Sequence, residues 1–225
     1  AWPKWFADGS RVVIQWMNRA QDEIRLFAVD PATGAKQEIY AEKQAAWVEF
    51  FPDLRFLKDG SGFLLKTDVD GWNHLYLYDL TGRLKTRLTQ GDWAVKSISL
   101  VDEKNRRVYF TSGRDGTTGT QLFRVGFDGR DLERLTREPG THFVQVSPGG
   151  SYFLDSFSAA ASPARQALYR TDGRLVRELP SPDANRWDGY RLARKEMFTI
   201  PTADGYALPA CWILPPDLDP GKKYP

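Results

Sequence analysis

The sequence predicts an all-β fold, a partial β-propeller of about four four-stranded antiparallel blades. Three observations support this prediction: short alternating apolar runs, turn residues between them, and recurrence of the whole cassette. The most complete copy is residues 63–95, FLLKTDVDGWNHLYLYDLTGRLKTRLTQGDWAV. In it Leu75 and Leu77 alternate with Tyr76 and Tyr78, which is the period of a strand with two distinct faces. Local alternation bounded by turns therefore favours strands throughout this copy.

The cassette recurs along the chain with a spacing of about 46 to 49 residues, which is in the range of propeller blades. In each copy a strand-like run ends in a Gly-containing turn, and an earlier turn precedes another apolar run. Each unit thus reads strand, turn, strand, loop, strand, turn, strand, as a blade does. The recurring runs and their turns are Leu26–Val29 with Thr33-Gly34, Leu75–Tyr78 with Thr81-Gly82, Leu122–Val125 with Asp128-Gly129, and Leu168–Arg170 with Asp172-Gly173.

These units occupy residues 1–182, which we predict to be the partial propeller. Because the first unit begins abruptly, we expect an excised piece of a larger ring, whose open sheet faces favour self-association. Residues 183–225 break the repeat, and we predict that they are a linker and the start of a different domain. Segments 45–51 and 183–195 could each form a short helix, but neither carries an apolar stripe at helical spacing.

Composition narrows the class of protein further. The net charge of +2, with both signs interspersed, argues against a nucleic-acid partner or a polybasic membrane surface. No apolar run approaches the roughly 20 residues that span a bilayer. Cys211 is the one cysteine, so an internal disulfide is excluded, and we expect this thiol to be buried and inert within its apolar run. The absence of any Asn-x-Ser/Thr sequon favours a bacterial protein over a glycosylated ectodomain.

The chain carries no recognisable catalytic signature. There is no G-x-S-x-G nucleophile motif and no phosphate-binding loop. His74 and His142 each follow a turn inside a cassette, so we expect them to have structural roles. With one cysteine and two isolated histidines, no metal cluster is predicted. The sequence therefore predicts no catalytic residue, metal or cofactor in this chain.

The aromatic residues divide into two groups. Phe50 and Phe51 are consecutive, which in a strand puts one ring on each face, so one of them should face a loop, a neighbour or a cavity. Four tryptophans near inter-strand corners are expected to pack as wedges between adjacent blades: Trp47, Trp72, Trp93 and Trp187.

Several segments match one family in the right order over nearly the whole chain. They are Val13–Trp16 with Arg19 and Gln21, Gly71–Tyr76, Leu88–Val95, Tyr152–Asp155, and Pro215 with Lys222–Pro225. In these residues the chain resembles the dipeptidyl peptidase IV branch of the prolyl oligopeptidase family. The resemblance implies the C-terminal half of an eight-bladed propeller, followed by the junction with an α/β-hydrolase domain.

The resemblance also implies a function. The parent would be a serine dipeptidyl peptidase that releases N-terminal Xaa-Pro or Xaa-Ala dipeptides, with its catalytic triad in the hydrolase domain. This chain would shape substrate access and be inactive alone. The implied partners are a peptide substrate with a free N-terminus, the hydrolase domain of the same protein and, as a homodimer, a second copy. The implied location is the bacterial periplasm or cell envelope.

In the family, the rim of the substrate pocket presents an aromatic residue followed by Arg. Trp47-Val48 anchors this match, which makes Phe50 or Phe51 the candidate aromatic residue. The Arg does not align, and Arg55 is a loose substitute for it. These three residues are the candidate substrate-binding residues.

Two other readings stay open at this point. One is a non-enzymatic binding propeller of the TolB type, which shares the blade pattern but has no reason to continue into the segment DGYALPACWILPP. The other is the propeller of a different prolyl oligopeptidase family member, such as an acylaminoacyl peptidase. The segment LTQGDWAV favours the dipeptidyl branch.

Overall fold

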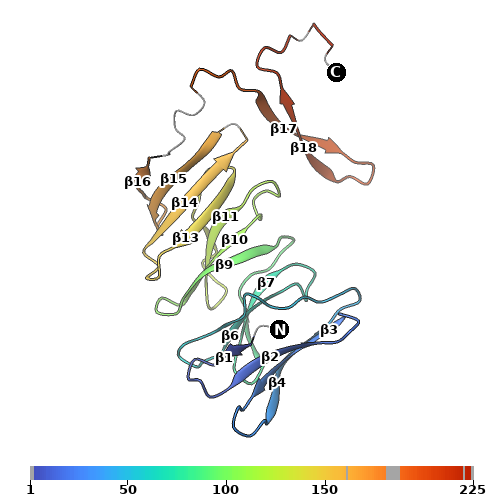
Figure 1. Cartoon of the computed structure of the whole chain (residues 1–225), viewed down its shortest axis with the longest axis vertical. Coiled ribbons are helices and arrows are strands. Elements are labelled where there is room, and N and C mark those ends of the chain that lie inside the picture. The colour runs from blue at the N-terminus through green and yellow to red at the C-terminus, as the bar shows by residue number, and fades with distance from the viewer. Residues whose placement is uncertain (1–2, 161, 181–187, 220, 224–225) are drawn as a thin grey trace. The chain divides into compact units, whose positions relative to one another are not determined.

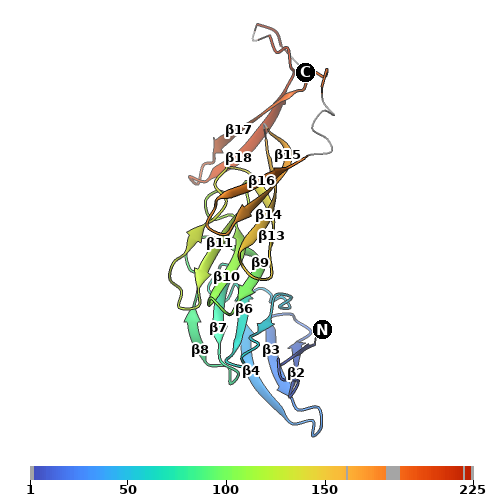
Figure 2. The same cartoon turned by 90° about the vertical axis from the view of Figure 1, so that its left-hand side faces the viewer.

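The computed structural model describes residues 3–160, 162–180, 188–219 and 221–223, and within these ranges every regular element is a strand (Figures 1 and 2). The strands form four four-stranded sheets and one hairpin, and in each sheet neighbours in sequence are neighbours in space. All pairings within the sheets are antiparallel. The prediction of an all-β fold with four-stranded antiparallel blades is confirmed. The described residues contain no helix long and apolar enough to cross a membrane.

We call the four sheets blades 1 to 4 and the last pair of strands the terminal hairpin. Blade 1 contains β1 (Lys4–Trp5), β2 (Val12–Met17), β3 (Glu23–Val29) and β4 (Lys36–Lys43). Blade 2 contains β5 (Arg55–Phe56), β6 (Phe63–Thr67), β7 (His74–Tyr78) and β8 (Leu84–Arg87). Blade 3 contains β9 (Val95–Asp102), β10 (Arg107–Ser112), β11 (Gln121–Gly126) and β12 (Glu133–Arg134). Blade 4 contains β13 (Thr141–Val146), β14 (Tyr152–Ala159), β15 (Ser162–Arg170) and β16 (Leu175–Leu179), and the hairpin contains β17 (Arg194–Pro201) and β18 (Ala207–Leu214).

The chain divides into two compact units. The first is Ala1–Arg114 with Leu122–Arg134, and the second is Asp115–Gln121 with Leu135–Pro225. Blades 1 and 2 and most of blade 3 lie in the first unit, while blade 4 and the terminal hairpin lie in the second. The predicted domain boundary at residue 182 falls outside the described residues and stays a prediction.

Blade 2 is buried on both of its faces. Phe63 and Leu65 belong to a core cluster shared with blade 1, whereas Leu64 belongs to a second cluster shared with blade 3. Every residue of β7 is buried. A strand covered on both faces can be apolar at successive positions, which explains why β6 begins as a continuous apolar run.

Blade 1 has a different pattern, because one of its faces is open. Val13 and Gln15 are buried, while Ile14 and Trp16 between them are exposed. Trp5 on the neighbouring strand is exposed as well. The alternation predicted for half-buried strands is therefore realised in β2. The expected self-association through such a face stays a prediction.

Gly82 shows why a turn between two strands of blade 2 requires glycine. Its φ is +91°, in the left-handed region. A Cβ atom at this position would lie 2.3 Å from the carbonyl oxygen of Ile39 in β4. The turn can thus approach the backbone of blade 1 closely because it has no side chain.

In the second unit, blade 4 buries one face. Phe153, Asp155 and Phe157 of β14 are buried in alternation, and the ring of Phe153 stacks on Tyr169 of β15 with centroids 5.2 Å apart. The predicted burial of Cys211 is wrong, since this residue is exposed. It lies on the two-stranded terminal hairpin, most of whose side chains are exposed, so an apolar run there does not imply burial.

The tryptophan prediction is confirmed at one position and wrong at two. Trp93 packs against the cluster shared by blades 2 and 3 and stacks on Phe110 with centroids 6.2 Å apart. Trp47 and Trp72 are exposed, although Val48, the neighbour of Trp47, belongs to the core cluster. Trp187 lies outside the described residues.

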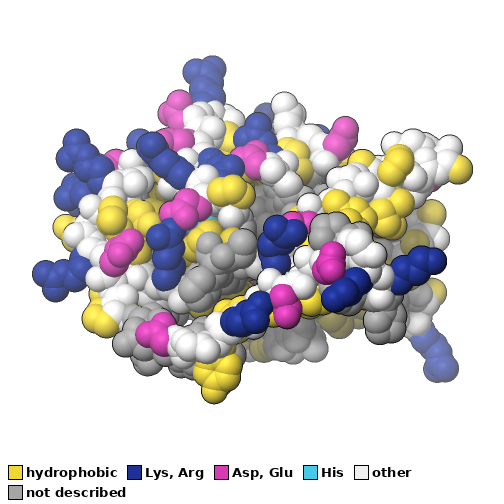
Figure 3. Space-filling model, turned by 90° about the horizontal axis from the view of Figure 1, so that it is seen from above, with side chains coloured by type: hydrophobic (Ala, Val, Ile, Leu, Met, Phe, Trp, Pro, Cys, Tyr) yellow, Lys and Arg dark blue, Asp and Glu magenta, His cyan; other side chains and the backbone are white. Residues whose placement is uncertain are grey.

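The remaining sequence-level expectations concern helices and charge. Residues 45–51 form no helix, and of residues 183–195 the described part is irregular until β17 begins. On the face drawn in Figure 3, Lys and Arg side chains lie among Asp and Glu side chains, as the balanced composition predicts.

Candidate functional site

A hollow of about 490 Å³ lies beside the loop that joins β4 to β5. Two aromatic residues face it, Trp47, which is 67% exposed, and the partly buried Phe50. Glu49 and Gln21 add polar groups to the lining. The lining residues are Met17, Gln21, Trp47, Val48, Glu49, Phe50 and Pro52. An open, largely apolar hollow with a few polar groups is suited to an apolar group of a ligand.

Gln15 fixes this loop in place. Its side-chain nitrogen donates to the carbonyl of Phe51 at 3.1 Å, and its side-chain oxygen accepts from the backbone N–H of Phe51 at 2.8 Å. The N–H of Val48 donates to the carbonyl of Gln21 at 2.6 Å. Because the Gln15 amide is buried, these bonds satisfy polar groups that water cannot reach. The loop therefore has a defined direction next to the hollow.

The loop direction separates the two consecutive phenylalanines. Phe51 is 6% exposed and packs edge-on against Tyr40 in the core shared by blades 1 and 2, with centroids 5.7 Å apart. Phe50 is partly buried at the edge of the same cluster and also lines the hollow. Of the two phenylalanines, Phe50 lines the hollow together with Trp47, whereas Phe51 does not.

Arg55 lies at the other end of the loop and is not among the lining residues. Its guanidinium donates to the carbonyls of Pro52 and Leu54, both at 3.3 Å, and lies 3.7 Å from the Asp53 carboxylate. Arg55 thus braces the loop. Substrate contact by Phe50, Phe51 or Arg55 stays a prediction.

A buried carboxylate supports the core behind Phe51. Glu42 accepts hydrogen bonds from the hydroxyls of Tyr40 at 2.6 Å and Thr67 at 2.5 Å, and from the side chain of Gln44. Burial, and then the bond to Glu42, raise the pKa of Tyr40 far above its ordinary value. Burial likewise raises the pKa of Tyr78 to about 12. These two phenols therefore stay protonated at neutral pH.

The two histidines occupy different polar networks. His74, at the start of β7, lies 3.0 Å from the hydroxyl of Thr89 through Nδ1 and 2.9 Å from the carbonyl of Gly91 through Nε2. The Thr89 hydroxyl oxygen already accepts from the N–H of Leu75, so its proton is free to point at Nδ1. A carbonyl can only accept, hence Nε2 carries the proton and the ring is neutral. Burial lowers the pKa of His74, which agrees with a neutral ring.

Gln121, at the start of β11, makes hydrogen bonds similar to those of His74. Its side-chain oxygen accepts from the hydroxyl of Thr136 at 2.7 Å, and its side-chain nitrogen donates to the carbonyls of Glu138 at 3.0 Å and Gly140 at 3.2 Å. An acceptor meets the threonine hydroxyl and a donor meets the glycine carbonyl, as at His74. The two repeats thus share a role that either a neutral imidazole or an amide can perform.

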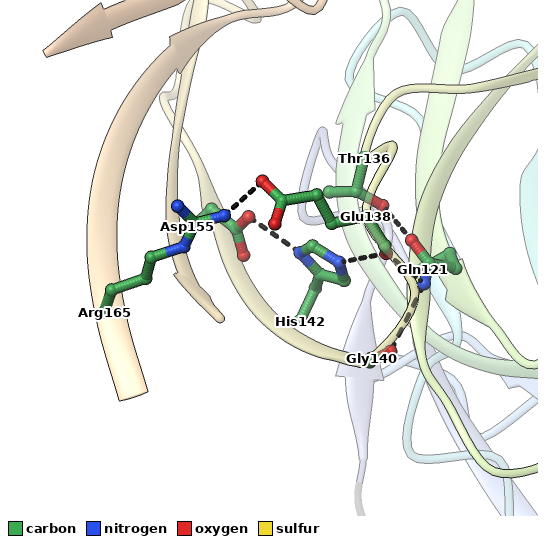
Figure 4. A network of polar contacts seen from close by, with 7 residues as sticks. All are labelled: Gln121, Thr136, Glu138, Gly140, His142, Asp155 and Arg165. Carbon is green, nitrogen blue, oxygen red and sulfur yellow. Dashed lines mark hydrogen bonds and ion pairs between the residues drawn. The ribbon is translucent and has the colours of Figure 1, made fainter. Parts of the chain in front are cut away.

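His142 in β13 has a different set of partners, shown in Figure 4. Its Nδ1 lies 2.7 Å from the Asp155 carboxylate, and its Nε2 lies 3.0 Å from the Glu138 carbonyl. His142 and Asp155 are 3% and 4% exposed. The Glu138 side chain is paired with Arg165. Both partners of the ring are acceptors, so the His142–Asp155 pair holds two protons and no net charge, wherever the shared proton sits.

One oxygen of the Asp155 carboxylate takes no part in the contact with His142. Asp155 Oδ1 is buried and has no hydrogen-bond partner among the described residues. Asp155 is one of the residues that line a separate cavity of about 130 Å³ in the second unit, although Oδ1 itself is buried. The described residues contain no group of three or more His, Cys, Asp or Glu side chains that could hold a metal ion.

Sequence reasoning missed three contributors to these sites. Trp47 was assigned to packing, although its neighbour Phe50 was singled out for a cavity. Gln15 gave no local signal, because its partner Phe51 is distant in sequence. The link between His142 and Asp155 depends on the register of β13 against β14, where His142 lies opposite Phe157 on the face that also carries Asp155.

Repeated four-stranded antiparallel blades, with a hollow at a blade-to-blade loop, define a β-propeller protein. The family model described as "Dipeptidyl peptidase IV (DPP IV) N-terminal region" matches residues 1–164. The chain belongs to this family.

Two curated relatives cover nearly all of the chain. Dipeptidyl peptidase 4 of Arthroderma otae is 28% identical over 233 residues, which cover 98% of this chain and 30% of that protein. Probable dipeptidyl-aminopeptidase B of Aspergillus oryzae is 29% identical over 242 residues, which cover 98% of this chain and 26% of that protein. The chain therefore spans less than a third of the length of either relative.

Solved structures give the same result. Dipeptidyl peptidase 4 of Porphyromonas gingivalis has a TM-score of 0.86 and 27% identity, and the match covers 96% of this chain and 31% of that one. A putative dipeptidyl aminopeptidase IV of Bacteroides ovatus has a TM-score of 0.79 and 25% identity, and the match covers 99% of this chain and 35% of that one.

Proposed function

We propose that this chain is the non-catalytic propeller part of a serine dipeptidyl peptidase that releases N-terminal Xaa-Pro or Xaa-Ala dipeptides. The observation that carries the proposal is the similarity over nearly the whole chain to dipeptidyl peptidases, in sequence and in fold. The serine nucleophile and its partners belong to a hydrolase domain that follows in the parent. In that protein the propeller admits and positions the peptide.

The hollow beside Trp47 and Phe50 is the part of this chain that we assign to the substrate. Its aromatic walls suit apolar side chains of the peptide beyond the scissile bond. Phe51 supports the loop from the core, and Arg55 holds its far end. The propeller thereby affects the binding of longer peptides more than that of dipeptide reporters.

The two alternative readings are not favoured. The relatives named above are dipeptidyl peptidases or dipeptidyl aminopeptidases, and none is a binding propeller of the TolB type or an acylaminoacyl peptidase.

The experiment that tests the proposal compares free and blocked substrates. The protein that contains this chain is assayed with Ala-Pro-p-nitroanilide and with its N-acetylated form. We expect release of nitroaniline from the free substrate and little from the acetylated one, because a dipeptidyl peptidase binds the free amine. Cleavage restricted to acetylated substrates would favour an acylaminoacyl peptidase instead and would overturn the proposal.

Location and assembly are part of the same proposal. We assign the parent to the bacterial periplasm or cell envelope; the bacterial sources of the two similar structures support the bacterial origin alone. Cell fractionation with antibodies to this chain tests it. The exposed apolar face of blade 1, with Trp5, Ile14 and Trp16, favours association with a second copy. Sedimentation of the chain before and after Trp16→Lys tests this second statement.

A further inference from the structure

The hollow beside the loop that joins β4 to β5 has one charged residue in its lining. Among the residues that line it, Glu49 alone is ionisable. Glu49 is exposed and forms no hydrogen bond or ion pair with the described residues. Because no partner holds this side chain, its carboxylate is free to turn toward a ligand that enters the hollow. Such a ligand meets a negative charge that no contact within the described chain neutralises.

Trp47 adds an aromatic surface to the same lining. Most of this side chain is exposed, and no Lys or Arg of the described residues lies over its ring. Arg19, in the same turn as Gln21, does not line the hollow and forms no ion pair within the described part of the chain. The face of a tryptophan ring attracts a cation more strongly than that of tyrosine or phenylalanine. The hollow therefore combines an open aromatic face with an unpaired carboxylate.

Elsewhere in the chain the same combination holds an arginine. The guanidinium carbon of Arg87 lies 5.7 Å from the ring centre of Tyr76, and one guanidinium nitrogen lies 3.1 Å from the Asp70 carboxylate. A guanidinium group stacks on an aromatic face and pairs with a carboxylate through its N–H groups. The arrangement occurs a second time in Arg165, Phe157 and Glu138. At Trp47 and Glu49 the ring and the carboxylate are present without an arginine from the described chain.

The loop that carries these two groups is held on both sides of Glu49. The N–H of Val48 donates to the carbonyl of Gln21 at 2.6 Å, and the buried amide of Gln15 bonds to the backbone of Phe51. Gln21 has a φ of +60°, in the left-handed region that residues other than glycine rarely adopt. Since the chain itself fixes the loop, a ligand does not have to order it, which favours binding.

We propose that the hollow binds an arginine side chain of the peptide substrate, at a position beyond the scissile bond, and that Glu49 selects it. The guanidinium pairs with the Glu49 carboxylate and stacks on the Trp47 ring, while the apolar stem of the side chain packs against Met17 and Phe50. The identity of the ligand as a peptide rests on the proposed function. The preference for a cation rests on the lining of the hollow alone.

The first test compares arginine with citrulline, which has as many non-hydrogen atoms in its side chain but no charge. The intact protein that contains this chain is assayed with Ala-Pro-Arg-Ala and Ala-Pro-Cit-Ala, and with the pair that carries the variable residue one position later. In at least one pair we expect kcat/KM for the arginine peptide to be higher by about threefold to tenfold, from one cation–π contact and one exposed ion pair.

Two variants connect this preference to Glu49. Glu49→Gln keeps the size of the side chain and removes its charge, so the ratio of kcat/KM between the arginine and citrulline peptides should fall to about one. The matched control is Asp92→Asn, at an exposed acidic residue that does not line the hollow, and it should keep the ratio of the wild type. An arginine preference that survives Glu49→Gln would overturn the proposal.

The second test does not require peptidase activity. The full 225-residue chain is titrated with N-acetylarginine methylamide while NMR follows the indole N–H signals of its tryptophans. We expect a saturating shift at Trp47 that N-acetylcitrulline methylamide does not produce and that Glu49→Gln removes. The signal of Trp72, which is exposed but does not line the hollow, should stay in place.

The two tests separate this inference from the proposed function. If the intact protein cleaves none of the peptides but arginine shifts Trp47 selectively, the proposed function is contradicted and the arginine site is supported. If every peptide is cleaved with equal kcat/KM for arginine and citrulline, or if the two amides shift Trp47 equally, the inference is overturned and the proposed function stands.

Discussion

The two histidine networks, one in each compact unit, use the same side chain in opposite ways. His74 sits between a hydroxyl that can donate and a carbonyl that accepts, so a neutral ring satisfies both neighbours. His142 sits between a carboxylate and a carbonyl, so its network requires an additional proton. Burial alone therefore does not determine the protonation state of a histidine, because the donors and acceptors that its two ring nitrogens contact determine it as well.

The comparison extends to what can replace each residue. Gln121 occupies the place of His74 in the next repeat and makes equivalent hydrogen bonds to Thr136 and Gly140. The side chain at this position of the blade has to accept one hydrogen bond and donate another, and both a neutral histidine and a glutamine can do so. The His142–Asp155 pair also has a buried carboxylate oxygen with no hydrogen-bond partner among the described residues, which the His74 network lacks. Four experiments test this difference between the two histidine networks.

The largest effect is expected from Asp155→Ala. This change leaves His142 without its carboxylate in a buried site, which typically costs about 3–5 kcal/mol of unfolding free energy. Urea unfolding of the full chain measures the loss. The control is Asp188→Ala, at an exposed residue, which should change the free energy by about 0.5 kcal/mol or less. A loss below about 1 kcal/mol in Asp155→Ala would mean that the pair is not an essential part of blade 4.

Substitution of each histidine by glutamine gives the sharpest matched pair. His74→Gln should cost about 1 kcal/mol or less, because Gln121 shows that an amide satisfies this position. His142→Gln should cost about 2–3 kcal/mol, because one amide leaves a buried polar partner unsatisfied. Equal losses in the two variants would show that the networks do not differ as described.

A smaller effect is expected from pH. Burial lowers the pKa of His74, the Gly91 carbonyl opposes this shift, and the charge of Arg87 adds to the lowering. The unfolded chain therefore binds a proton at His74 more readily than the folded chain does. His74 contributes stability above its unfolded pKa of about 6.5, and this contribution is lost as the pH falls below that value. The difference in unfolding free energy between wild type and His74→Gln should therefore decrease from pH 7.5 to pH 5. An increase over this range would contradict the lowered pKa of His74.

The protonation of the two histidines can also be measured without any substitution. In the unaltered chain near pH 7, nitrogen-15 NMR should show one protonated and one unprotonated ring nitrogen at His74. At His142 both nitrogens should show bonded or shared protons, because both partners are acceptors. A free lone pair on Nε2 of His142 would contradict the assignment.

The blades could be predicted from sequence because their signals are local. Alternation of Leu75 and Tyr76, and the turn at Gly82, are each contained within a few residues, and their recurrence identifies the blade. The burial of Cys211 was predicted wrongly for the opposite reason. An apolar run predicts a buried strand only when other elements cover it, and β18 belongs to an isolated hairpin.

The sites were only partly predictable. Adjacent residues in an extended segment differ in direction, but the sequence does not show which of Phe50 and Phe51 is the more deeply buried. The bonds from Gln15 decide this, and they connect residues far apart in the chain. The equivalence of His74 and Gln121 was available in the sequence, because each opens a strand before a Leu-Thr pair.

We propose that this chain shapes a reaction performed elsewhere in its parent protein. The most direct measurement is a paired assay with Gly-Pro-p-nitroanilide, first on the purified 225-residue chain and then on the intact protein that contains it. We predict no turnover by the chain alone and release of nitroaniline by the intact protein. Turnover by the purified chain, or none by the intact protein, would contradict the account.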